Sequence, residues 1–177
     1  ECTGLLYGIL ADTRRLTSGA ASADYEAASF LHGGVDEDAL DRIANPQVSA
    51  ETLEVKARAI AGRQVQGSFA VSDVGTLSNA DAIPQAAEEL ITLEGVTAVV
   101  VIGEQEGTGI LHLSGRSRDD RVHMGRALGH ALEDIAGAGA GGHARMGGGQ
   151  IDRGDDESPL SRDKLTEVIF HSLEGDV

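Results

Sequence analysis

The sequence predicts an α/β protein in which a helical N-terminal part precedes a small mixed sheet flanked by helices. Segments with helix caps and stop signals fill residues 1–62, and strand-like patterns alternate with helical ones from residue 63 onward. The longest apolar run, residues 96–103, is typical of a buried strand and is shorter than the roughly 18 residues that a membrane span needs. We therefore expect two parts, residues 1–62 and residues 63–177, and no membrane segment.

Four helices are expected in the first part, over residues 1–11, 22–31, 36–44 and 50–61. Ser22 and Ser49 stand where N-cap residues are favoured, because their hydroxyls can accept from the first free N–H groups of a helix. The Gly33-Gly34 pair ends the second helix and the Asn45-Pro46 pair ends the third.

The second part is expected to alternate strands and helices. The strands are predicted at residues 64–71, 96–104 and 108–117, with a further short one at 149–152. The helices are predicted at residues 79–93, 122–135 and 161–173. Pro84 is compatible with the first of these helices if it stands in the first turn. Residues 152–158, DRGDDES, form an expected charged loop.

The charge composition is strongly acidic. The 177 residues carry 29 Asp and Glu against 14 Lys and Arg, which gives a net charge of −15, and only Lys56 and Lys164 are lysines. This surface is typical of adaptation to high salt, where a Debye length of about 3 Å screens self-repulsion, and it suggests a halophilic archaeon. The overall field repels nucleic acid, so any phosphate site must rest on a local basic patch.

The cysteine content and the N-terminal sequence indicate where in the cell the protein is expected. Cys2 is the single cysteine, which excludes an internal disulfide and a zinc cluster of cysteines, and the sequence shows no secretory signal. We expect a cytoplasmic location. The chain begins at Glu1 inside an apolar pattern, so we expect it to be the downstream part of a longer protein.

The most unusual segment is the glycine-rich stretch AGAGAGGHARMGGGQI, residues 136–151. Glycines in series are found in flexible linkers, and also in ordered loops whose bare N–H groups surround a phosphate. The periodic segments on both sides favour the ordered loop. His143 and Arg145 lie within this loop and could add hydrogen bonds to an anion.

Two further segments contain candidate site residues. Arg116, Arg118 and Arg121 follow a predicted strand, and Arg116 and Arg118, at a spacing of two, could grip one anion. The alternative is a solvated hairpin end whose arginines pair with Asp119 and Asp120. Asp12 follows the first apolar helix pattern and is either a hard-cation ligand or a turn residue.

Three segments, in this order along the chain, resemble motifs of the DHH/DHHA1 phosphoesterase family. GILADTRRL, residues 8–16, is similar to the G-I-x-x-D-T motif near the end of the DHH domain. HLSGRSR, residues 112–118, is similar to the Arg-Ser at a strand end of the DHHA1 domain, and AGAGGHARMGG, residues 138–148, to its G-G-G-H loop. The resemblance covers nearly the whole chain and lies nearest the nanoRNase/pAp-phosphatase, RecJ-like branch.

The resemblance implies a division of labour between the two parts. Residues 1–62 correspond to the end of a DHH domain with a linker helix, and residues 63–177 to a DHHA1 substrate-binding domain. The complete enzyme holds two Mn²⁺ ions, with Asp12 as a catalytic metal ligand. Substrates are short 5′-phosphorylated oligonucleotides, pAp or single-stranded nucleic acid. The implied substrate-binding residues are Arg116, Ser117, Gly141, Gly142, His143 and Arg145.

The chain also departs from the family pattern. Ala140 stands where a glycine is usual, and the D-x-D and D-H-H motifs, which supply most metal ligands, are expected upstream of Glu1. We therefore expect the chain alone to be nearly inactive. A non-catalytic nucleotide or single-strand binding module is the main alternative, and a cyclic-dinucleotide phosphodiesterase is not separable by sequence. GILADT argues against an alanyl-tRNA synthetase editing appendage, and a homodimer is retained as a candidate assembly.

Overall fold

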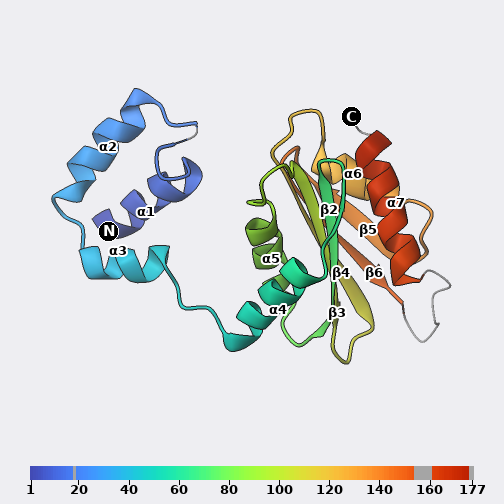
Figure 1. Cartoon of the computed structure of the whole chain (residues 1–177). Helices are drawn as coiled ribbons and strands as arrows, with labels where there is room; N and C mark the ends of the chain where they lie inside the picture. The colour runs from blue at the N-terminus through green and yellow to red at the C-terminus, as the bar shows by residue number, and fades with distance from the viewer. Residues whose placement is uncertain (18, 154–160, 176–177) are drawn as a thin grey trace. The chain divides into compact units, whose positions relative to one another are not determined.

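The computed structural model describes residues 1–17, 19–153 and 161–175 (Figure 1). The chain divides into two compact units, Glu1–Val48 and Ser49–Val177. The sequence analysis placed the division near Gly62 instead. The difference concerns the helix at residues 50–61, which belongs to the second unit because its Val55 and Ala59 are fully buried in a core that this unit supplies.

The first unit consists of three helices, α1 (Cys2–Asp12), α2 (Ser22–His32) and α3 (Glu37–Ala44). All three expected helices are confirmed within two residues. Asp36 caps α3, where its carboxylate accepts from the Ala39 N–H at 3.0 Å. The prediction for Ser22 is wrong: Ser22 is the first residue of α2, and the Asp24 carboxylate accepts from the Ala21 N–H at 2.8 Å instead.

The second unit is a six-stranded mixed sheet flanked by helices, as the sequence predicts. The strands lie in the order β1-β2-β3-β4-β6-β5; β2 and β3 are parallel, and every other neighbouring pair is antiparallel. The elements are α4 (Ala50–Ala61), β1 (Gln64–Gln66), β2 (Phe69–Leu77), α5 (Ala82–Leu90), β3 (Ala98–Gln105), β4 (Ile110–Ser117), α6 (Met124–Leu132), β5 (Ala138–Gly142), β6 (Met146–Asp152) and α7 (Arg162–Gly175).

Helices cover the two faces of the sheet unequally. On one face, α4 and α5 pack over β2 and β3, where Val99 and Val101 are fully buried. On the other face, α6 and α7 pack over a core that extends from β2 to Ile151 of β6 (Figure 1). Among the described residues, no helix covers β6 and β5 on the face over which α4 and α5 pack. This end of the sheet is therefore open.

Three expected elements differ from the structure. The strand predicted at residues 64–71 is a hairpin, because Gly67 turns the chain with a φ of 57° between β1 and β2. The glycine-rich stretch is not a loop: it forms β5, a short turn and β6, so the strand expected at residues 149–152 begins at Met146. Of the predicted charged loop, residues 154–158 lie outside the described residues.

An ion-pair cluster fixes the start of α7. Arg162 donates through one Nη to both carboxylate oxygens of Asp73, at 2.8 and 3.0 Å, and through the other to Glu104 at 2.6 Å. Asp73 lies on β2 and Glu104 on β3. One guanidinium thus joins the N-terminal end of α7 to two strands. Within the described ranges, no helix combines the length and apolarity needed to cross a membrane.

Candidate functional site

The turn of the glycine hairpin is fixed against the N-terminal end of α6. The N–H groups of Met124 and Gly125 donate to the carbonyls of Ala144 and His143, at 2.9 and 3.1 Å. On the other side, the Ser117 N–H donates to the carbonyl of Arg145 at 2.9 Å. The turn therefore presents its carbonyls to α6 and β4, and its side chains remain on the outside.

Two glycines make this close approach feasible. A Cβ on Gly125 would stand 2.6 Å from the carbonyl carbon and oxygen of Gly142. Gly142 itself has a φ of 148°, and a Cβ there would overlap the Met146 carbonyl. Glycine is thus needed at position 125 for packing between helix and hairpin, and at position 142 for the close approach of the hairpin's own two strands. At His143 the backbone N–H donates to the Met146 carbonyl at 2.7 Å, so it is not open to a ligand.

Other glycines of the hairpin face the open end of the sheet. An added Cβ on Gly139 or Gly141 would meet no atom within 4 Å. The strand register places Gly139 beside Gln150, and Gln150 beside His112 of β4. Together they form the floor of an open cavity of about 830 Å³, bounded by the N-terminal part of α5.

Arg116 lies on β4, on the same face as this cavity. One Nη donates to the Ser114 hydroxyl and to the Gly115 carbonyl, both at 3.0 Å, and the other donates to Glu88 of α5 at 3.1 Å. The side chain is 15% exposed. Its Nε–H is buried and has no hydrogen-bond partner among the described residues. A buried charged donor without a partner is rare in native proteins and points to an anion that completes its hydrogen bonds.

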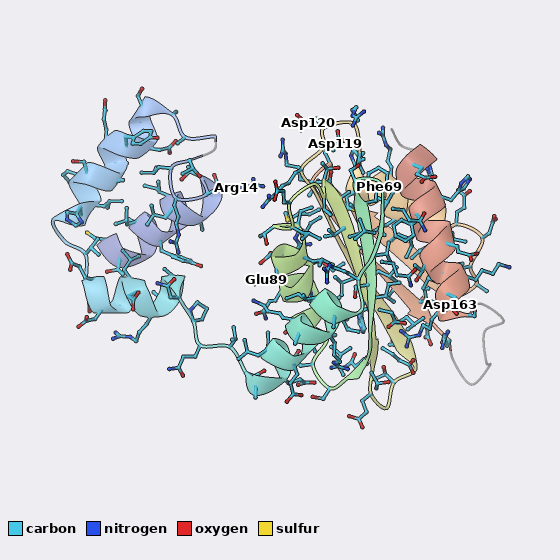
Figure 2. The ribbon with its side chains drawn as sticks, viewed as in Figure 1. Arg14, Phe69, Glu89, Asp119, Asp120 and Asp163 are labelled. Carbon is cyan, nitrogen blue, oxygen red and sulfur yellow. The ribbon has the colours of Figure 1, made fainter. Side chains whose placement is uncertain are left out.

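The other two predicted basic residues, His143 and Arg145, lie in the turn of the glycine hairpin. His143 is exposed, and the described residues offer its imidazole no hydrogen-bond partner. Arg145 pairs with Asp120 at 2.6 Å on the surface. Arg121 pairs with Asp119 at 2.7 Å and lowers the pKa of that carboxyl by hydrogen bonding. Figure 2 shows Asp119 and Asp120 in the loop that follows β4.

The alternative of a solvated hairpin end holds only in part, and the gripping of an anion by the strand-end arginines stays a prediction. Arg118 does not continue the strand, because β4 ends at Ser117 and the Arg118 N–H donates to the Thr97 carbonyl at 2.7 Å. Arg118 is exposed, whereas Arg116 is held against α5. The expected pairing holds for Arg121, which pairs with Asp119, and not for Arg116, which pairs with Glu88.

The Ser117 side chain is buried, and its hydroxyl bonds to the backbone and not outward as a ligand-binding hydroxyl would. It is 5% exposed, and its hydroxyl donates to the Asp119 carbonyl at 3.0 Å and accepts from the Asp119 N–H at 3.1 Å. Both bonds lie within the turn after β4. In this geometry Ser117 orients the end of the strand on which Arg116 lies.

Asp12 is an exposed residue at the end of α1, in the first unit. The next residues make an unusual turn, in which Arg14, Arg15 and Leu16 all have positive φ values of 48, 59 and 63°. The Thr13 hydroxyl supports the turn by donating to the Ile9 carbonyl at 2.6 Å. Across the described ranges, no three His, Cys, Asp or Glu side chains form a group that could hold a metal ion. The described residues therefore do not by themselves fit a metal pair.

Several residues of the site were not singled out from the sequence. They are Glu88, His112, Ser114 and Gln150. The usable signal was the spacing along β4, since residues 112, 114 and 116 share one face of a strand. Gln150 and Glu88 come from other elements. The strand register places Gln150 beside this face, and the hydrogen bond from Arg116 places Glu88 of α5 there.

Comparison with known proteins identifies a family and a fold. A family model described as the DHHA1 domain matches residues 66–171. The uncharacterized protein MJ1633 of Methanocaldococcus jannaschii is 32% identical over 176 residues, which are 99% of this chain and 35% of that protein. The cyclic-di-AMP phosphodiesterase GdpP of Geobacillus thermodenitrificans is 29% identical over 180 residues, covering 99% of this chain and 25% of the relative.

The chain thus spans about a third and a quarter of the length of these two relatives. Among solved structures, an exopolyphosphatase-related protein from Bacteroides fragilis superposes with a TM-score of 0.73 at 18% identity. The superposition covers 98% of this chain and 49% of that protein, and it shows a shared fold. The family match includes Arg116, the glycine hairpin and the residues of the cavity. Since it extends over more than half of the sequence, the chain belongs to the DHHA1 domain family.

Proposed function

We propose that this chain supplies the substrate-binding half of a metal-dependent phosphoesterase for short 5′-phosphorylated oligonucleotides or pAp. The observation that carries the proposal is the buried Arg116 Nε–H, which has no hydrogen-bond partner among the described residues. A phosphate oxygen satisfies such a donor, and guanidinium is suited to phosphate geometry. The name of the relative GdpP, a cyclic-di-AMP phosphodiesterase, supports a nucleotide phosphodiester as the substrate class.

The chain's own residues would act by binding and orientation. Arg116 holds the substrate phosphate through Nε while the Ser114 hydroxyl and the Gly115 carbonyl hold the guanidinium in place. The imidazole of His143, exposed on a turn that α6 and β4 fix, adds a second hydrogen bond to the same anion. Arg145, paired with Asp120, contributes positive charge at the rim.

In this proposal, the metal ions act in a longer protein of which this chain is a part. Two Mn²⁺ ions would activate water for attack on phosphorus, with Asp12 as one ligand and the remaining ligands from outside the described residues. The chain alone is then expected to bind substrate without hydrolysing it. We place the longer protein in the nanoRNase, RecJ-like branch, in the cytoplasm of a halophile.

The test uses the longer protein with Mn²⁺ in high salt, a 5′-labelled RNA dinucleotide, and pAp. We expect hydrolysis by the wild type, none by Asp12→Ala, and a raised KM with a similar kcat for His143→Ala. An Asp36→Ala variant, which removes a helix cap in the same unit as Asp12, is the matched control for loss of fold. Wild-type hydrolysis without Mn²⁺, or an active Asp12→Ala variant, would contradict the assigned metal role.

A non-catalytic nucleotide-binding module is the second candidate. This candidate requires only the buried Arg116 Nε–H, which has no hydrogen-bond partner among the described residues, and requires no metal ligand. Under this alternative, the longer protein binds the dinucleotide with an affinity that depends on Arg116, and no Mn²⁺ concentration produces hydrolysis.

A further inference from the structure

The turn that follows α1 in the first unit has a strained backbone. Arg14, Arg15 and Leu16 have φ values of 48, 59 and 63°, so three successive residues with side chains are left-handed. Residues other than glycine adopt this conformation rarely, and then singly, because their Cβ approaches the following carbonyl oxygen. Strain of this kind persists only where surrounding contacts enforce it, and it gathers at ligand clamps and active sites. The turn therefore marks a candidate binding site.

Hydrogen bonds from α1 and α2 enforce this conformation. The Arg15 N–H donates to the Leu10 carbonyl at 2.6 Å, and the Leu16 N–H donates to the Thr13 hydroxyl at 3.0 Å. The Tyr25 hydroxyl of α2 donates to the Leu16 carbonyl at 2.7 Å. None of these bonds uses an arginine side chain. The turn is thus fixed through its backbone, and its two guanidinium groups are left to other partners.

These two guanidinium groups are weakly engaged. Both arginines are exposed, and among the described residues the Arg14 side chain has no hydrogen-bond or ion-pair partner. Arg15 donates to Asn45 Oδ1 at 3.4 Å, near the outer limit of hydrogen-bond geometry. The nearby carboxylate of Asp41 is bonded to the Asn45 amide at 2.7 Å. Neither arginine is neutralised by a carboxylate, so both can bind an anion from solution.

The two arginines line a pocket of about 260 Å³ that lies within the first unit. Tyr7, Leu10 and Ala11 of α1 and Ala44 of α3 form the rest of its wall. Among the described residues, no Asp or Glu belongs to this lining, although Asp12 follows Ala11 in the chain. Figure 2 shows the arginine at position 14 on the turn after α1. The pocket combines two cations with an uncharged wall.

This local charge is opposite to that of the surrounding sequence. Residues 1–48 are rich in Asp and Glu, contain no lysine, and have Arg42 as their only arginine outside the turn. Such a surface repels anions, so an anion can bind only where guanidinium groups gather without carboxylates. A guanidinium fork matches oxyanion oxygens and not a spherical halide. The three free oxygens of a phosphate are enough for two forks.

We propose that the pocket beside Arg14 and Arg15 binds the phosphate group of a small anion. Each guanidinium donates to phosphate oxygens, and Tyr7 and Leu10 cover the ligand on the apolar side. The inference goes beyond the proposed function and does not depend on it, because none of these residues belongs to the site at Arg116. The phosphate has two sources, a free inorganic phosphate or a nucleotide, and the experiment distinguishes them.

The test is an NMR titration of this chain with pyrophosphate, read at the backbone N–H signals of Ala11 and Ala44. The signal of Gly141, in the hairpin, reports the Arg116 region separately. We expect saturable shifts at the two alanines. The double variant Arg14→Gln, Arg15→Gln should weaken the binding that they report at least about tenfold, because two charge-assisted contacts are lost, and should leave the response of Gly141 unchanged.

The matched control is Arg42→Gln, which removes the same charge from the same unit at a position outside the pocket lining. It should change the affinity less than about twofold, because exposed charges at a distance are screened. If Arg42→Gln weakens binding as much as the double variant, net charge and not the pocket attracts the anion, and the proposal is refuted. Equal binding of acetate, a carboxylate with two oxygens, contradicts a phosphate site.

Titration with ADP, which carries the same diphosphate on a nucleoside, distinguishes the two sources. Tighter binding of ADP than of pyrophosphate at Ala11 and Ala44 assigns the pocket to a nucleotide, and equal or weaker binding assigns it to free phosphate. If the signals of both alanines stay in place while that of Gly141 shifts, this pocket is refuted and the proposed function stands. If the alanine signals shift and Gly141 does not respond, the pocket stands and the phosphate site at Arg116 fails.

Discussion

Replacing Glu88 by glutamine is expected to tighten anion binding at Arg116 about fourfold at low salt. Glu88 accepts from Arg116 Nη at 3.1 Å, and its side chain is 64% exposed, so it competes with a ligand for the same guanidinium. A phosphate at the neighbouring Nε would stand about 5 Å from this carboxylate. Two unit charges at that distance repel by about 0.8 kcal/mol in a water-like dielectric, which corresponds to about a fourfold change in Kd.

The assay is titration of wild type and Glu88→Gln with ribose 5-phosphate, at low salt and in about 1 M KCl. Since the Debye length is about 3 Å at that ionic strength, the gain should nearly disappear in the concentrated salt. Glu89→Gln is the matched control, because it removes the same charge from the same helix while Glu89 pairs with Lys56 instead.

Two results would refute this reasoning. If Glu88→Gln weakens binding, the carboxylate orients Arg116 for the ligand, and orientation outweighs competition. If Glu89→Gln gives the same gain, the effect comes from the overall charge of −15 and not from the pair at Arg116.

Three predictions concern stability. Arg162→Met should lower the free energy of unfolding by about 2–3 kcal/mol in urea titration, because it leaves two partly buried carboxylates without their shared partner. The hydroxyl and N–H of Ser78 lower the pKa of Glu51, so the ionised Glu51 carboxylate stabilises the fold at pH values above the pKa of this residue in the unfolded chain. Acid titration should show that this contribution is lost as the pH falls below about 4, with a smaller loss in Ser78→Ala. Gly125→Ala should destabilise by about 1–3 kcal/mol through its contact with the hairpin, whereas Gly129→Ala on the same helix should stabilise slightly; equal thermal melts would contradict the packing role.

Local signals in the sequence were sufficient to predict most helices and the central strands. Ser49 caps α4 as expected, with its hydroxyl accepting from the Thr52 N–H at 3.0 Å, and Pro84 does stand in the first turn of α5. The run at residues 96–103 is a buried strand because both faces of β3 are covered by helices. Each of these features depends on residues that are neighbours in the sequence.

The glycine hairpin could not be predicted in this way. Glycine has low strand propensity and leaves no alternation of apolar and polar residues, so residues 138–149 lack the usual pattern. They become strands because β4 supplies a long pairing partner for β6, and α6 covers one face of the hairpin. For the same reason the sequence does not predict the cavity, because glycines of the hairpin leave its space open and its polar side chains come from separate strands.

The fixed turn of the glycine hairpin has a thermodynamic consequence for ligand binding. Because the carbonyls of His143, Ala144 and Arg145 are already bonded to α6 and β4, this part of the backbone has little freedom left to lose when a ligand arrives. The entropic cost of binding then falls mainly on a few side chains, and Arg116 is already held by three hydrogen bonds. A loop of seven glycines without these bonds would have to order on each encounter. The hairpin is therefore a preorganised surface, on which a small anion can be bound without prior ordering of the backbone.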